Sequence, residues 1–132
     1  MMNKEQKRMY IDDMSTQFDK NDSVIVTHYQ GLTVSQLDDL RDKMRAHGIK
    51  FKITNNRITK LALEKTRCKE LTNLFTGPTA VALSDDAITS AKILTKFSKD
   101  NENLKILGGI MGADILDIAG IKNVATLPSL DE

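Results

Sequence analysis

Hydrophobic residues recur along this chain with two different periods, one typical of helices and one typical of strands. The helical period predicts segments over residues 4–18, 34–47, 57–62, 71–75, 87–99 and 114–119. The alternating and β-branched patterns predict strands over residues 24–29, 49–54, 79–83 and 104–110. Helices and strands are therefore expected to alternate along nearly the whole chain.

The second of these strands has the most informative pattern. Ile49, Phe51 and Ile53 alternate with Lys50 and Lys52. Because side chains along a strand point to opposite faces in turn, the pattern predicts one buried face and one exposed basic face.

Local signals support the predicted ends of the second helix. Thr33 followed by Gln36 is the pattern of a capping box, and Gly48 supplies a residue that readily takes the left-handed conformation at a helix end. The resulting order, α-β-α-β-α-β-α-β-α, predicts an α/β (α+β) fold in a single domain. We expect a mixed four-stranded sheet with helices packed on it, mainly on one side.

Length and composition fit one globular domain. With 132 residues the chain can bury a core without disulfides or metal, and its single cysteine excludes an internal disulfide. No stretch approaches the roughly 20 apolar residues of a membrane span, and the charged start has no apolar run after it. These features predict a cytoplasmic protein with no membrane partner, cofactor or structural metal.

Few residues of the chain have chemistry that could support catalysis. Cys68 with His28 and His47 would nominally supply a nucleophile and a base, but the three fall in unrelated predicted elements, and space filling explains the cysteine better. The glycines of residues 108–112 lack the spacing of a phosphate-binding loop and predict a tight strand-to-helix turn. Adjacent acids such as Asp85-Asp86 are expected to cap helices.

Charge is distributed unevenly along the chain. Residues 1–67 carry 13 Lys and Arg against 9 Asp and Glu, whereas residues 68–132 carry 6 against 9. Between Arg41 and Arg67, nine basic residues accompany only two acidic ones. Such an excess is typical of a nucleic-acid contact, although a solvated lysine-rich surface is the alternative.

The basic residues of this region fall where they can act together. They are accompanied by two asparagines in the predicted loop between strand and helix; the set is Lys52, Asn55, Asn56, Arg57 and Lys60. Free backbone N–H groups at a helix start favour phosphate, as the cations do. Asparagine amides can add hydrogen bonds to sugars or base edges.

Residues 51–64 resemble the strand-loop-helix signature of bacterial ribosomal protein L-ten, the stalk-base protein of the large subunit. Three further stretches agree with this family in the same order: residues 29–41, residues 75–80 with their Gly-Pro turn, and residues 127–132, which resemble its interdomain hinge. The resemblance spans essentially the whole chain.

The resemblance implies a structural protein, with no enzymatic activity, that binds large-subunit rRNA near the translational GTPase centre. Its partners would be that rRNA and a neighbouring stalk-base ribosomal protein, on the ribosome in the cytoplasm. It places Asn56, Arg57 and Lys60 at the RNA, with the opening turn as a second contact through Lys4, Lys7 and Arg8. The family usually has Lys or Arg where this chain has Asn55, so one phosphate contact is lost or moves to Lys52.

The resemblance also divides the chain into two parts. Residues 1–126 would form the rRNA-binding domain, and residues 127–132 the hinge and start of a helix. In the family that helix carries acidic stalk dimers, so we expect dimer binding only in a longer chain, and the ending suggests a truncated or isolated domain. Two alternatives remain: a translational regulator that binds its own messenger RNA through the same surface, and a small thiol enzyme.

Overall fold

The computed structural model describes residues 3–54, 56–64, 66, 69–112 and 114–126. Its helices are α1 (Lys4–Lys20), α2 (Val34–Ala46), α3 (Asn56–Leu63), the 3₁₀ helix η1 (Lys69–Leu74), α4 (Ala87–Asp100) and α5 (Ile118–Ala125). Its strands are β1 (Ser23–His28), β2 (Lys50–Ile53), β3 (Thr79–Ser84), β4 (Lys105–Met111) and β5 (Asp114–Asp117). The α/β fold class predicted from the sequence is confirmed.

The strands form one sheet in the order β2-β3-β1-β4-β5. Every pair of neighbours in it is antiparallel, so the expected mixed sheet is wrong, and the sheet has five strands rather than four. The helical crossovers explain the difference. Strands joined through α2 or α4 run parallel, but another strand lies between them each time, as in split βαβ arrangements.

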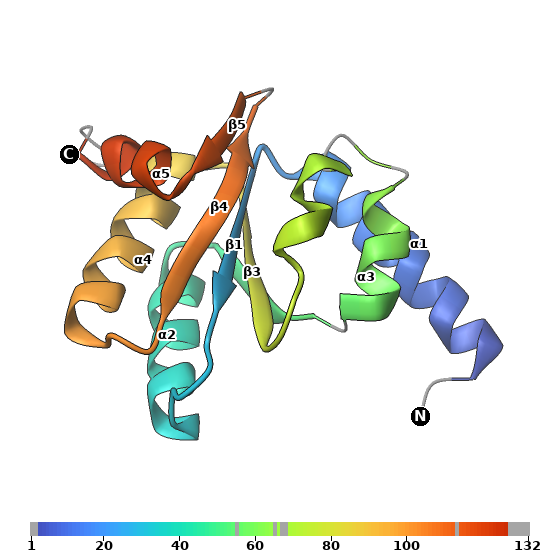
Figure 1. Ribbon diagram of the computed structural model, residues 1–132, viewed down its shortest axis with the longest axis horizontal. Coiled ribbons are helices and arrows are strands. Elements are labelled where there is room, and N and C mark those ends of the chain that lie inside the picture. The colour runs from blue at the N-terminus through green and yellow to red at the C-terminus, as the bar shows by residue number, and fades with distance from the viewer. Residues whose placement is uncertain (1–2, 55, 65, 67–68, 113, 127–132) are drawn as a thin grey trace.

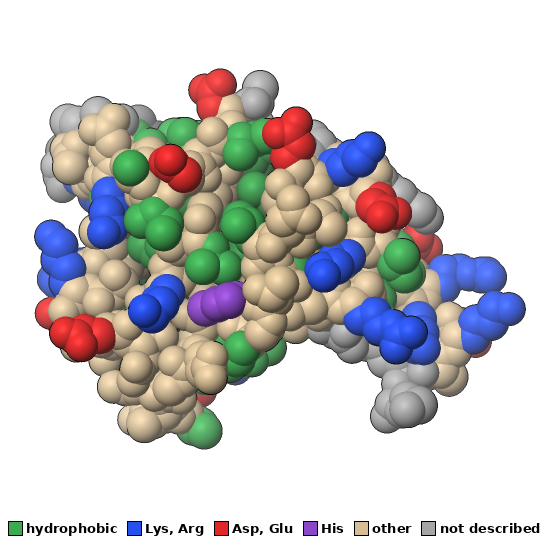
Figure 2. Space-filling model, viewed as in Figure 1, with side chains coloured by type: hydrophobic (Ala, Val, Ile, Leu, Met, Phe, Trp, Pro, Cys, Tyr) green, Lys and Arg blue, Asp and Glu red, His purple; other side chains and the backbone are tan. Residues whose placement is uncertain are grey.

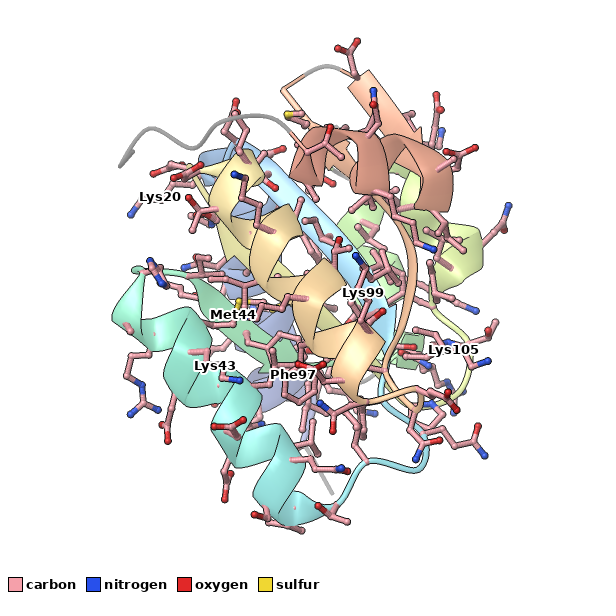
Figure 3. The ribbon with its side chains drawn as sticks, turned by 90° about the vertical axis from the view of Figure 1, so that its left-hand side faces the viewer. Lys20, Lys43, Met44, Phe97, Lys99 and Lys105 are labelled. Atoms are coloured by element: carbon pink, nitrogen blue, oxygen red, sulfur yellow. The ribbon has the colours of Figure 1, made fainter. Side chains whose placement is uncertain are left out.

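Helices cover both faces of the sheet, as Figure 1 shows with the sheet nearly edge-on. On one face Met14 and Phe18 of α1 pack with residues of α3, η1 and the sheet. On the other face Met44 of α2 and Phe97 of α4 meet residues of α5 and the sheet (Figure 3). The expectation of helices mainly on one side is therefore wrong. The unbroken apolar run of β1 reflects burial on both faces, because Val24 and Val26 belong to one core and Ile25 to the other.

The segment after β4 differs most from the sequence prediction. A helix was predicted over residues 114–119, but β5 occupies Asp114–Asp117 and α5 begins only at Ile118. Gly112, with φ of 62°, allows the chain to turn back so that β5 pairs with β4. Asp117 then caps α5 by accepting a hydrogen bond from the Gly120 backbone N–H at 2.8 Å.

Signals at helix ends were more reliable. The predicted capping box of Thr33 and Gln36 is present at the start of α2, and Asn3 and Gln6 form a second one at the start of α1. Gly48 has the predicted left-handed conformation after α2, with φ of 71°. Among the described residues, no helix is long and apolar enough to cross a membrane.

Candidate nucleic-acid interface

Helices α1 and α3 lie side by side on the same face of the sheet (Figure 1). The Tyr10 hydroxyl and the Thr59 hydroxyl are 2.9 Å apart, and the Ser15 hydroxyl donates to the Ala62 carbonyl at 3.3 Å. The contacts advance together along both helices, so the helices run in the same direction. Their N-terminal ends therefore lie at the same end of the pair.

Five cationic side chains gather at this shared end, which we call the basic end: Lys4, Lys7, Arg8, Arg57 and Lys60. All are exposed except Lys60, which is half-buried. Figure 2 shows Lys and Arg side chains clustered over the N-terminal part of α1. None of the five has an ion pair with a carboxylate among the described residues. The structure thus brings together two sequence segments that the sequence analysis could link only through the family resemblance.

The basic face predicted for β2 is partly occupied by α1. The Lys52 ammonium lies 3.5 Å from the Asp13 carboxylate, and the Lys50 ammonium donates to the Gln17 side-chain oxygen at 3.3 Å. Both lysines are in register with residues of β3 that face α1, which explains the contact. The predicted open basic face is thus wrong in part, and Ile53, predicted to be buried, is 42% exposed.

Asn56 has an internal role that the sequence did not reveal. Its side-chain N–H donates to the Gly77 carbonyl at 2.6 Å, and its side-chain oxygen accepts from the Thr54 hydroxyl at 3.3 Å. These bonds fix the start of α3 against the Gly77-Pro78 turn. A contact between Asn56 and RNA stays a prediction, and Asn55 lies outside the described residues.

Comparison with known proteins identifies the family of this chain. Residues 2–99 match the family model for Ribosomal protein L10. A Pelagibacter ubique protein named Large ribosomal subunit protein uL10 is 70% identical over 131 residues, which cover 99% of this chain and 79% of that protein. A protein of the same name from Rhodospirillum rubrum is 48% identical over 131 residues, covering 99% of this chain and 76% of that protein. The chain belongs to the ribosomal protein L10 family.

Membership of a ribosomal protein family confirms the resemblance seen in residues 51–64 and favours a non-catalytic role. Of the candidate thiol site, His28 ends β1 and His47 follows the end of α2, while Cys68 lies outside the described residues. Within the described ranges, no group of three or more His, Cys, Asp or Glu side chains is placed to hold a metal. Of the adjacent acids at 85–86, which were expected to cap helices, Asp86 caps α4.

Proposed function

We propose that this protein is a structural component of the large ribosomal subunit and binds large-subunit rRNA at the base of the stalk through its basic end. The observation that carries the proposal is the parallel packing of α1 and α3, which brings Lys4, Lys7 and Arg8 beside Arg57 and Lys60. Family membership supports the ribosomal role, and the cluster of cations, which have no ion-pair partners among the described residues, supports the RNA contact.

The proposed contact is mainly electrostatic and depends on the shape of the RNA. Exposed ammonium and guanidinium groups bind phosphates, while side-chain hydrogen bonds to 2′-hydroxyls distinguish RNA from DNA. The N-terminal ends of α1 and α3 add partial positive charge at the same place. Lys52 and Asn56 border this surface in our proposal, where Lys52 contacts phosphate and Asn56 holds the start of α3 in position. Asn55 is included in the proposed RNA-binding set on the strength of the family resemblance.

The partners proposed for this chain follow from the same role. Besides rRNA, we propose a neighbouring stalk-base ribosomal protein as a contact, on the ribosome in the cytoplasm. Residues 1–126 are proposed as the rRNA-binding domain and residues 127–132 as a hinge. Binding of acidic stalk dimers is proposed only for a longer chain that carries the helix following the hinge.

The test is binding of the chain to a stalk-base rRNA fragment and to an unrelated RNA of equal length, over a series of salt concentrations. We expect selective binding to the fragment, with an affinity that falls steeply as salt rises. Arg57→Ala should weaken binding and reduce the slope of log affinity against log salt by about 0.7 to 0.9, the value for one phosphate contact.

Lys99→Ala is the matched control, because Lys99 is an exposed cation on α4, away from the basic end (Figure 3). It should leave both affinity and slope unchanged. Equal weak binding of the two RNAs by the unaltered protein would contradict the proposed function. Selective binding that Arg57→Ala leaves unchanged would remove Arg57 from the interface.

A further inference from the structure

A second basic surface lies away from the N-terminal ends of α1 and α3, in a groove between α2 and the edge strand β2. Six residues line this groove: Arg41, Arg45, Ile49, Lys50, Phe51 and Lys52. Its volume is about 330 Å³. Its charged side chains are the two arginines of α2, because Lys50 and Lys52 line the groove from β2 while their ammonium groups lie at Gln17 and Asp13 of α1. No lining residue is acidic, so the groove has the charge of a site for anions.

The cations of this α2–β2 groove repel one another in the protein alone. Arg41 and Arg45 are four residues apart on one helix, where like charges are neighbours and destabilise the helix. Lys50 and Lys52 lie on the adjoining strand, but their ammonium groups point to the face of the sheet that α1 covers. Among the described residues, neither arginine has an ion pair with a carboxylate.

Arg41 is the more buried of the two groove arginines. Its side chain is half-buried, and its Nε is buried with no hydrogen-bond acceptor among the described residues. A buried donor without an acceptor costs free energy, which a bound ligand with a nearby acceptor oxygen can recover. A planar guanidinium also loses less side-chain entropy per hydrogen bond formed than a lysine ammonium does.

The position of β2 at the edge of the sheet offers another explanation for Lys50 and Lys52. Lysines on an edge strand prevent pairing with the strands of other molecules, and β2 is an edge of this sheet. That explanation accounts for Lys50 and Lys52 but not for Arg41 and Arg45, which belong to a helix. The open edge also presents backbone N–H groups, which bind anions at sheet edges elsewhere.

We propose that the α2–β2 groove binds the phosphodiester backbone of RNA at a point separate from the basic end. Two arginines with planar guanidinium groups match phosphate oxygens in pairs of hydrogen bonds. The small volume fits one or two phosphate groups of a strand that passes over the edge of the sheet. This inference rests on the proposed function, because it assigns a second contact to the same rRNA.

The test compares two double variants of the chain in the rRNA-fragment binding assay. Arg41→Gln with Arg45→Gln should lower affinity roughly 10- to 50-fold near 0.1 M salt and reduce the salt slope by about 1.4 to 1.8, as expected for two lost phosphate contacts. Lys96→Gln with Lys99→Gln removes the same charge from exposed positions of α4 and should change neither quantity. Footprinting of the RNA should show that the groove variant loses protection at nucleotides other than those lost with Arg57→Ala.

The outcomes separate this inference from the function on which it rests. Selective binding by the unaltered protein, with the groove variant equal to the α4 control, would overturn the inference and leave the proposed function intact. Loss of protection at the same nucleotides as Arg57→Ala would overturn the separate contact. Absence of selective binding by the unaltered protein would overturn both. If the double arginine variant fails to fold by circular dichroism, Arg45→Gln alone replaces it, because Arg45 is exposed, and it should lower the slope by about 0.7 to 0.9.

Discussion

The Asp86 side chain caps the start of α4, and the hydrogen bonds of this cap lower the pKa of its carboxyl group. Its carboxylate accepts hydrogen bonds from the Thr89 hydroxyl at 2.6 Å and from the Thr89 backbone N–H at 3.1 Å. The hydroxyl bond is the main reason that the pKa of Asp86 lies below its ordinary value of 3.8, with a smaller contribution from the charge of His47. Because the pKa is lower in the folded state, the ionised carboxylate stabilises folding above the unfolded-state pKa.

This stabilisation is lost as pH falls through the lowered pKa of the folded state. We therefore predict that Asp86→Ala reduces the free energy of unfolding by about 1 kcal/mol at pH 7, the usual cost of removing a helix cap. The difference from the unaltered protein should shrink below about pH 4. Urea denaturation between pH 7 and pH 3 measures this difference in the free energy of unfolding. Glu102→Ala, at an exposed position, is the control. A difference that stays constant over this range would contradict the role of the ionised cap.

At the scale of elements, the start of α3 depends on a residue without charge. Asn56 joins it to the turn before β3 through the bond to the Gly77 carbonyl. We predict that Asn56→Ala lowers the free energy of unfolding by about 1 kcal/mol, the usual net worth of a hydrogen bond, and weakens rRNA binding modestly. The salt slope should not change, because no phosphate-neutralising charge is removed. Thermal denaturation and the salt series measure the two effects, and a lowered slope would count against this positioning role.

Elements with local signals could be predicted from the sequence, and elements that depend on distant contacts could not. The capping box of Thr33 and Gln36 predicted the start of α2 because all its partners lie within one turn. Strand β5 has only four residues and forms through its pairing with β4, which no local pattern encodes. The strand order was likewise hidden, because β3 inserts between strands that are earlier in the chain.

The candidate site divides in the same way. The positive charges of Arg57 and Lys60 could be identified because they are close together in the sequence. The ion pair between Lys52 and Asp13 and the bonds of Asn56 required the packing of α1 and the Gly77 turn. The sequence pattern also did not identify Arg41 and Arg45 of the α2–β2 groove as a site. The only available signal was the excess of basic residues from position 41 onward, which does not show that α2 and β2 face each other.

At the scale of the whole molecule, the formal net charge of +1 hides an uneven surface. Exposed acids such as Glu70 and Asp114 lie on η1 and β5, while exposed cations lie at the start of α1. Figure 2 shows acidic side chains along the top of the molecule and basic ones at the lower right. Salt screens charges beyond about 8 Å at physiological ionic strength, so the local cluster matters more for RNA binding than the total.

This reasoning gives a prediction that separates local from total charge. Glu70→Gln with Asp114→Asn raises the net charge by two, yet it should change rRNA affinity by less than about 2-fold at 0.15 M salt and leave the salt slope unaltered, because neither residue contacts phosphate. Arg57→Ala changes the net charge by only one and should have the larger effect. The comparison is made in the salt series used for the other variants. If the acid variant instead strengthened binding as much as Arg57→Ala weakens it, total charge would govern the interaction, and the basic end would lose its status as a specific contact.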